Sequence, residues 1–302
     1  MTIMKKMNMM LAACALISML PGCLEIDTPE NIVEKPAEGD GVPVYKVVAH
    51  RGGSAECKLP DSSVASLEYA IGLNCYASET DIVITADRDI LICHPDGNGL
   101  VNGLDPYTHT VAEIRAAGKL ANGEQIPTLS DFLNVVTDRK KNPNGLKLWL
   151  DVKRWSDISR SVEACLRACV IISGAGAQDF CEFLIPTGED IFMAVRDKVI
   201  NDYKINIAWM TCTSPAMYSD PKDYGKVWAQ LAYRKILGAS PESSYRPLDY
   251  FNAGLPLSIY GVDDDASMAE TIPYYPKLKA IFTNYPAALI AKLKENGMKP
   301  GE

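Results

Sequence analysis

The sequence of 302 residues predicts an α/β fold in which one domain forms a (β/α)8 TIM barrel. From residue 46 onward, short runs rich in β-branched residues alternate with helical patterns, which implies parallel strands joined by right-handed crossovers. Eight such runs suit a closed barrel. No Gly-x-Gly-x-x-Gly or P-loop segment follows any of them, which disfavours an open nucleotide-binding sheet, the alternative architecture.

The elements of this barrel can be placed in chain order. The expected strands are 46–50, 77–83, 146–152, 181–185, 205–210, 227–232, 255–260 and 279–283. The expected helices are 62–73, 111–117, 129–136, 158–172, 189–199, 248–253, 266–272 and 287–296, with none assigned between 210 and 227. Thr110 and Glu113 form a capping box, Asp61 and Ser62 are the expected caps of the first helix, and Gly297 ends the last.

The first 45 residues are expected to lie outside the barrel, which occupies 46–302. Residues 1–22 combine Lys5 and Lys6 with an apolar stretch, 7–20, that is too short to span a bilayer. The Leu-Pro-Gly-Cys that follows resembles a bacterial lipobox, so this segment is predicted to be a lipoprotein signal peptide and Cys23 the lipidation site. Residues 23–45 are acidic and rich in proline, as in a flexible tether.

These features predict a bacterial envelope protein, anchored by lipid on the periplasmic or outer-membrane side, with cell-surface exposure left open. An ordinary signal peptide or a buried N-terminal helix is the alternative for residues 1–22. The net charge of −8 disfavours nucleic acid and anionic membrane surfaces as partners, so the membrane is reached only through the anchor, and no protein partner is implied. Of nine cysteines, Cys14 lies in the signal and Cys23 is the predicted anchor, and the seven that remain, at scattered spacing, predict neither a disulfide framework nor a zinc site.

Three carboxylates lie on the second and third expected strands. The two-residue period of a strand puts Glu79 and Asp81 on one face, and likewise groups Asp151 with Trp149 and Lys153. The leucines of the third strand take the opposite face and are expected to meet the helices, so the carboxylates point into the barrel mouth. Three clustered carboxylates are costly to bury without a compensating cation, and oxygen ligands suit Ca²⁺ or Mg²⁺. The sequence therefore predicts one divalent cation.

Two histidines accompany these carboxylates. His50 ends the first strand, where active sites of parallel barrels lie, and His94 follows the second strand. Arg51 is opposite in parity to His50, so the Gly52-Gly53 loop must turn it inward. Two imidazoles, an arginine, a lysine and a divalent cation at one mouth suit a phosphate ester, because cations neutralise its charge while imidazoles move protons.

Taken together, these residues resemble the glycerophosphodiester phosphodiesterase family. The resemblance covers about residues 46–294. Its segments are His-Arg-Gly from 50, Pro-Asp-Ser-Ser from 60, Glu-Thr-Asp from 79 with His94, Ile-Pro-Thr-Leu from 126, Asp-Val-Lys from 151, and Thr-Asn-Tyr-Pro from 283, where the family normally has Thr-Asp-x-Pro.

The resemblance implies hydrolysis of small-molecule glycerophosphodiesters to glycerol 3-phosphate and an alcohol. It also implies a role for each site residue: His50 and His94 as the general acid and base, Glu79, Asp81 and Asp151 as metal ligands, and Arg51 and Lys153 as phosphate contacts.

Besides Asn284, three positions depart from the family pattern. Asp61 and Asp151 stand where the family has glutamate, and Pro95 replaces an aspartate that could orient His94. These changes keep open a second reading, a barrel that binds a phosphorylated ligand with weak or no turnover. They also keep open a third, a related phosphodiesterase for a different head group or a polyol-phosphate polymer.

Overall fold

The computed structural model describes residues 44–301 apart from 187, 211, 219 and 224. Eight parallel strands close into a barrel, because β1 pairs with β9 on one side and with β2 on the other. The strands are β1 Tyr45–Ala49, β2 Cys75–Ile84, β3 Ile90–Ile92, β4 Lys147–Val152, β5 Cys181–Ile185, β6 Asn206–Trp209, β7 Val227–Ala232, β8 Leu257–Tyr260 and β9 Ala280–Thr283. The predicted (β/α)8 barrel is confirmed.

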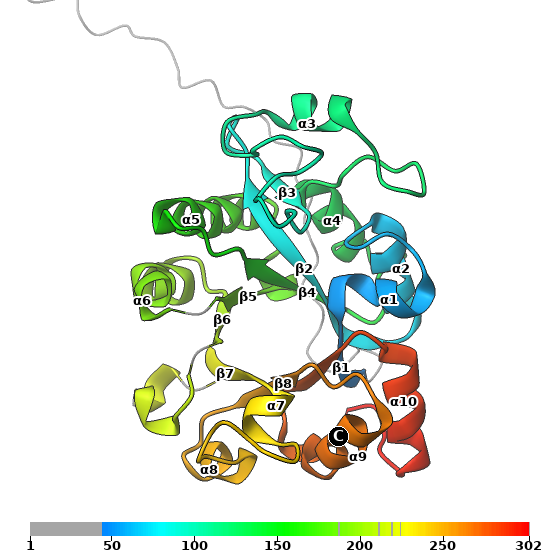
Figure 1. The fold of residues 1–302 in the computed structure, drawn as a ribbon, viewed down its shortest axis with the longest axis vertical. Helices are drawn as coiled ribbons and strands as arrows, with labels where there is room; N and C mark the ends of the chain where they lie inside the picture. The colour runs from blue at the N-terminus through cyan, green and yellow to red at the C-terminus, as the bar shows by residue number, and fades with distance from the viewer. Residues whose placement is uncertain (1–43, 187, 211, 219, 224, 302) are drawn as a thin grey trace, which may run out of the picture. The chain divides into compact units, whose positions relative to one another are not determined.

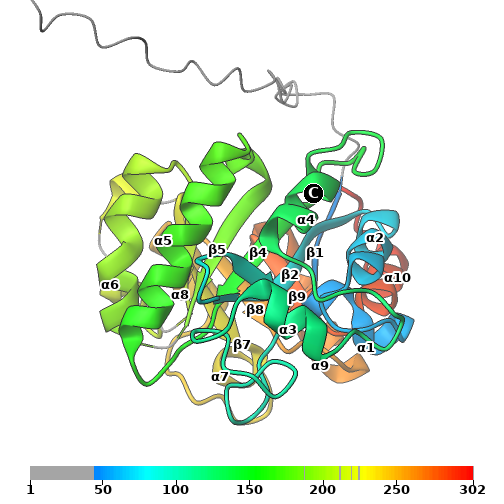
Figure 2. The ribbon, with the colours of Figure 1, turned by 90° about the horizontal axis from the view of Figure 1, so that it is seen from above.

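The helices lie outside the ring of strands (Figure 1), and the view from above shows the same layering (Figure 2). In Figure 1, α5 and α6 flank β4 to β6, and α2 and α10 flank β1. The helices are α1 Ser54–Cys57, α2 Val64–Gly72, α3 Val111–Ala117, α4 Leu129–Val136, α5 Ile158–Gly174, α6 Glu189–Asp197, α7 Tyr233–Ile236, α8 Pro247–Asn252, α9 Asp265–Thr271 and α10 Pro286–Glu295.

Local capping explains where several helices begin. The Thr110 hydroxyl accepts a hydrogen bond from the Glu113 amide, and the Glu113 carboxylate accepts one from the Thr110 amide, so the predicted capping box is confirmed. The prediction for α2 was wrong. Its cap is Ser63, whose hydroxyl accepts from the Ser66 amide, because Asp61 is held by other partners at the barrel mouth.

The sequence missed several short elements. β3 pairs antiparallel with the carboxyl end of β2, extending that strand into a hairpin beyond the barrel. α1 and α7 are single turns of four residues, too short to show a period. Between β6 and β7, where the sequence pattern did not allow a helix to be placed, the described residues contain two 3-10 turns, Pro215–Met217 and Pro221–Asp223.

At the amino-terminal boundary, Tyr45 was assigned to the tether but is the first residue of β1, and its side chain is buried. The predicted signal peptide and lipidation site lie outside the described residues, as does the rest of the tether up to residue 43. Among the residues that the structure describes, no helix is long and apolar enough to cross a membrane.

The floor of the barrel is closed by aromatic rings and a buried ion cluster. Trp149 of β4 and Trp228 of β7 pack at 5.2 Å between ring centroids, which confirms the inward orientation predicted for Trp149. Below them Glu182 accepts hydrogen bonds from Trp149 Nε1 at 2.7 Å and Tyr76 Oη at 3.0 Å, and its other oxygen lies 3.1 Å from Lys279 Nζ. The open end is therefore the opposite one, where the strands finish.

Candidate active site at the mouth of the barrel

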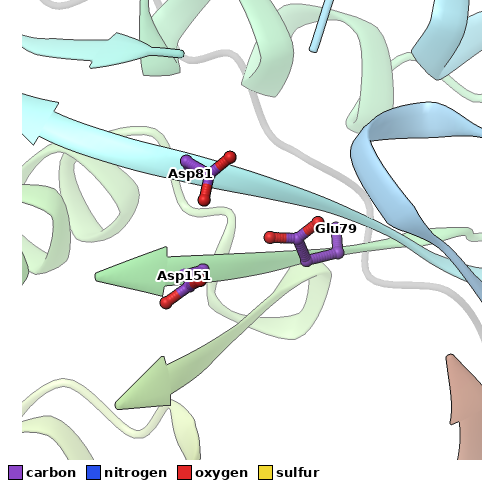
Figure 3. A group of neighbouring side chains, drawn as sticks. All are labelled: Glu79, Asp81 and Asp151. Carbon is purple, nitrogen blue, oxygen red and sulfur yellow. The ribbon is translucent and has the colours of Figure 1, made fainter. Parts of the chain in front are cut away.

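Glu79, Asp81 and Asp151 meet at the carboxyl ends of two adjacent strands. Asp81 and Asp151 are register partners across β2 and β4, and Glu79 lies two residues earlier on β2 (Figure 3). One oxygen from each carboxylate lies within 4.8 Å of the others. Glu79 and Asp81 are buried, and Asp151 is partly exposed. The predicted carboxylate cluster is therefore present, because strand pairing places two alternating patterns side by side.

The cluster is electrostatically strained. Burial, together with the charges of Asp81 and Asp151, raises the pKa of Glu79 well above its usual value. Burial likewise raises the pKa of Asp151, although Lys153 opposes the shift. Lys153 Nζ lies 2.5 Å from Asp81 and 2.9 Å from Asp151. Burial lowers the pKa of Lys153, but these two carboxylates outweigh it, so the pKa lies above the usual value and the ammonium stays charged.

Arg51 reaches the same cluster through a left-handed turn. Its φ is 46°, and Gly52 and Gly53 continue in the left-handed region, which turns the guanidinium inward as the parity argument required. The Arg51 amide donates to Glu79 at 3.1 Å, and Nη1 donates to Asp61 at 2.8 Å. Asp61 also accepts from the Ser54 hydroxyl at 2.6 Å. The short Asp61 carboxylate thus positions the arginine.

Only glycine fits at the centre of this turn. A Cβ on Gly52 would lie 2.5 Å from the Ser66 hydroxyl oxygen and 2.6 Å from the Ser66 carbonyl carbon. Its φ of 78° is also costly for any residue with a side chain. Gly52 therefore allows α2 to pack directly under the turn that aims Arg51 and His50.

The Nε2 atom of His50 faces the barrel mouth, and Asn284 and Phe282 hold the opposite side of the ring. Its Nδ1 lies 2.6 Å from Asn284 Oδ1, and its ring packs on Phe282 with 5.2 Å between centroids. Its Nε2 is 3.8 Å from Glu79 Oε2. Burial lowers the pKa of His50, so the neutral imidazole that can accept a proton is favoured.

Whereas His50 is partly buried, His94 is exposed. Its Nδ1 is 2.6 Å from the carbonyl oxygen of Pro95, which supplies the acceptor that the missing aspartate would have offered. The preceding Cys93 amide donates to the Asp81 carbonyl at 3.0 Å, which ties this segment to β2. Desolvation of the shielded part of the ring lowers the pKa of His94.

The donor set fits a hard divalent cation. Three carboxylates converge against two nearby positive groups, Lys153 and Arg51. Asp81 Oδ2 is buried and, among the described residues, accepts no hydrogen bond, although Arg51 Nε lies 3.0 Å away. A buried oxygen without a hydrogen bond is costly unless another ligand satisfies it. The cluster could therefore hold a metal ion through its oxygen ligands.

The sequence missed two residues of this site. Asp263 had no predicted role, yet it accepts three hydrogen bonds from Thr283 and Asn284. Asn284 had been noted only as a departure from the family pattern. The sequence does indicate that both residues lie near the barrel mouth, because each follows the end of a strand. Which side chains they bond there depends on how β8 and β9 pair, and the sequence does not show this.

The Gly- and Asn-rich excursion after β3 and the β4–α5 loop form a cavity of about 290 Å³, lined by Asn98, Gly99, Leu100, Asp105, Trp155, Ser156, Asp157 and Arg160. None of the three carboxylates lines this cavity, so it is distinct from the cluster.

Comparisons with known proteins agree with this geometry. A Parabacteroides distasonis glycerophosphodiester phosphodiesterase structure matches with a TM-score of 0.67 at 20% identity, over 85% of this chain and 100% of that chain. A phosphodiesterase of Oleispira antarctica, solved with the product sn-glycerol-3-phosphate, matches with a TM-score of 0.61 at 18% identity, over 83% of this chain and 97% of that chain. At these identities the matches establish the fold.

One relative is similar to part of this chain in sequence. The Bacillus subtilis protein YhdW, provisionally named a glycerophosphodiester phosphodiesterase, is 31% identical over 97 residues. The resemblance to the glycerophosphodiester phosphodiesterases is confirmed. The matched part is 29% of this chain and spans 38% of that relative's length. No family model matches the chain.

Proposed function

We propose that this protein is a metal-dependent phosphodiesterase that hydrolyses glycerophosphodiesters to glycerol 3-phosphate and an alcohol. One observation carries the proposal: a buried carboxylate cluster, two cationic side chains and the imidazole of His50 converge at one barrel mouth. The relatives' names and the product bound in the Oleispira antarctica structure support the substrate class.

The imidazoles supply the proton transfers. A phosphodiester is anionic, so cleavage needs a deprotonated nucleophile and a protonated leaving alkoxide. In both His50 and His94 the Nδ1 atom faces an oxygen acceptor, which leaves the Nε2 atom of each ring for proton transfer with the substrate. One imidazole takes the proton of the attacking hydroxyl, and the other gives a proton to the departing alcohol. If the glycerol hydroxyl attacks, water then opens the cyclic glycerol phosphate and the two imidazoles exchange roles, so both return to their starting protonation states. If water attacks directly, the two imidazoles recover their starting states by exchanging one proton each with solvent.

Glu79, Asp81 and Asp151 would hold one Ca²⁺ or Mg²⁺. The ion supplies charge neutralisation at the phosphate when bound. The ion would also compensate the negative charge of the carboxylates that Lys153 and Arg51 now pair with. The two side chains could then bind the phosphate oxygens instead. The roles of Arg51 and Lys153 as phosphate contacts thus depend on exchange of ion-pair partners.

The deciding assay measures glycerol phosphate release from a panel of glycerophosphodiesters, with and without chelator. Release that stops on chelation and returns with Ca²⁺ or Mg²⁺ supports the proposal. Binding of the substrates without release would instead support the ligand-binding alternative. Release only from other phosphodiesters, such as a polyol-phosphate polymer, would replace the substrate class while keeping the chemistry.

The attacking group can be identified with a substrate that lacks the glycerol hydroxyl next to the phosphoester. If that hydroxyl attacks to give a cyclic glycerol phosphate, the substrate is inert. If water attacks directly, it is still cleaved.

We also propose that the chain is lipidated at Cys23 and works in the bacterial cell envelope on the tether 23–45. The support is the lipobox-like segment that follows the basic and apolar residues 5–20. Mass spectrometry of the mature amino terminus tests this. A diacylglycerol-modified Cys23 is expected, whereas an unmodified Cys23 or a retained Met1 would contradict it.

A further inference from the structure

Asp263 and Asn284 connect the β8–α9 loop to the back of His50. Asp263 Oδ1 accepts from the Thr283 hydroxyl at 3.1 Å and from the Asn284 amide at 2.7 Å. Asp263 Oδ2 accepts from Asn284 Nδ2 at 2.8 Å. The Tyr285 amide in turn donates to the Thr283 hydroxyl at 3.0 Å, so that hydroxyl directs its proton to the carboxylate.

These contacts fix the orientation of the Asn284 amide. An ionised carboxylate can only accept hydrogen bonds, so the group of Asn284 that faces Asp263 must be the NH₂. Its carbonyl oxygen then faces His50 Nδ1, at 2.6 Å. A carbonyl oxygen cannot donate, so the Nδ1 atom of His50 must carry the proton.

We infer that Asp263 and Asn284 are positioning residues that hold His50 in the tautomer with its proton on Nδ1. The lone pair of Nε2 then faces the mouth, on the side where Glu79 Oε2 lies 3.8 Å away. The catalytic consequence rests on the proposed function, because only a hydrolase needs that lone pair. The tautomer itself follows from the hydrogen bonds alone.

A neutral amide can do this only because a second residue orients it. By itself an asparagine could turn either its oxygen or its NH₂ toward the imidazole, and so would accept both tautomers. Asp263 removes that freedom. In the Ser-His-Asp arrangement of hydrolases, one carboxylate accepts the Nδ1–H hydrogen bond and fixes the tautomer of the histidine. Here Asn284 and Asp263 together fix the tautomer, and the group in contact with the histidine is a neutral amide.

The tautomer can be read by ¹⁵N NMR of the imidazoles in the full chain. The chain has three histidines, so the signals can be assigned with His94→Gln and His109→Gln. The spectra are recorded at about pH 8.5, where His50 is neutral because burial lowers its pKa below the usual imidazole value of about 6.5. The His50 signals are expected to show a protonated Nδ1 and an unprotonated Nε2. A protonated Nε2 in the unaltered protein would overturn the inference whether or not the protein hydrolyses any substrate.

Variants test the role of Asp263. In Asp263→Ala the amide of Asn284 loses its anchor, so His50 should become a mixture of tautomers, and kcat should fall by the share of the Nδ1-protonated form that is lost, about twofold for an even mixture, with little change in KM. The matched control is Asp265→Ala, two residues away, whose side chain is 87% exposed and pairs with Lys292. It should change neither the tautomer nor kcat. An unaltered His50 spectrum in folded Asp263→Ala would contradict the inference.

A donor–acceptor exchange provides the rescue. In the double variant Asp263→Asn with Asn284→Asp, the amide at position 263 keeps one oxygen for the Thr283 hydroxyl and the backbone amide, and its NH₂ donates to the carboxylate at position 284. That carboxylate accepts from His50 Nδ1, so the Nδ1-protonated tautomer should return. Asn284→Asp alone brings two carboxylates together and should lose activity and stability. A double variant no better than Asn284→Asp would overturn the inference.

Discussion

Lys153 Nζ lies 2.5 Å from Asp81 Oδ1, across the β2–β4 pair and within the buried carboxylate cluster. The same ammonium is 2.9 Å from Asp151 Oδ2. One lysine therefore joins two of the three candidate metal ligands. In the protein without a metal ion, Lys153 does part of the charge compensation that a divalent cation would otherwise supply.

We predict that Lys153→Met destabilises the metal-free protein by about 3 kcal/mol, because removing one partner leaves a buried charge uncompensated. Urea unfolding measures the effect, and added Ca²⁺ or Mg²⁺ should recover more stability in this variant than in the unaltered protein. Arg154→Met is the control, since Arg154 pairs with Asp190 at the surface and should contribute less than about 1 kcal/mol. Equal losses in both variants would contradict the prediction.

The raised pKa of Glu79 predicts an unusual pH dependence. A carboxyl whose pKa is raised by folding stabilises the native state most below its unfolded value of about 4.5, and this contribution is lost as pH rises through the folded pKa. The metal-free protein should therefore lose stability relative to Glu79→Gln as pH rises. Urea midpoints of both proteins, from about pH 4.5 to about pH 8.5, check this.

Divalent cations should reverse that trend. Protons compete with the metal for the carboxylates, so Ca²⁺ or Mg²⁺ should bind more tightly at higher pH, and Glu79→Gln should remove most of the effect. Calorimetric titration at two pH values measures it. If cation affinity is the same at both, the three carboxylates do not form the metal site.

His50→Ala and His94→Ala should each lower kcat by about 10²- to 10⁴-fold, because each imidazole carries one of the two proton transfers. Circular dichroism should show an unchanged fold in both. His109→Ala is the control: its Nδ1 faces the Asp105 carbonyl in the excursion after β3, so kcat should be unchanged. Near-normal kcat in one catalytic variant would remove that histidine from the reaction, and in both would exclude acid–base catalysis by histidine.

Gly52→Ala should destabilise the fold by more than the ~1–2 kcal/mol of left-handed strain, because the new methyl group meets Ser66. The control is Gly103→Ala, which has nearly the same φ, 79° against 78°, and no atom within 4 Å of its Cβ. The difference between the two variants in free energy of unfolding measures the contact with α2. Equal losses would show that the close approach is not required.

Glu182 in the floor of the barrel predicts a loss of folding stability at low pH. Burial opposes ionisation of Glu182, but Lys279 and Lys147 with their neighbours lower its pKa from 4.5 to about 2. A lowered carboxyl pKa stabilises the fold above the unfolded value, and this is lost as pH falls toward the folded one. The contribution is at most about 3 kcal/mol, and less in net, because burial also lowers the pKa of Lys279.

The Glu182→Gln variant isolates that contribution. The stability gap between the two proteins, measured by urea unfolding, should shrink as pH falls from about 7 to about 3. A gap that does not change with pH would mean that Glu182 acts by hydrogen bonding rather than by charge.

The sequence by itself determined the barrel and most of the candidate site. Residues of alternating polarity on β2 and β4 specify which side chains face inward. Side-chain direction alternates every two residues in any strand, however the helices pack around it. His50 follows β1, and parallel topology brings the end of that strand to the mouth. His94 follows β3, whose antiparallel pairing with β2 brings the chain back beside Asp81. These features are local or follow from a repeated βα unit, so one chain suffices to infer them.

Tertiary structure alone decided the contacts between strands that are distant in sequence. Asn284 is 234 residues from His50 and 21 residues from Asp263 in the sequence, and nothing in the local sequence distinguishes Asp263 from the exposed Asp265. Lys153 and Arg51 were expected at a phosphate, yet both pair with carboxylates, because a buried charge takes the nearest opposite charge. Which donor meets which acceptor depends on barrel closure, and a strand pattern does not encode it.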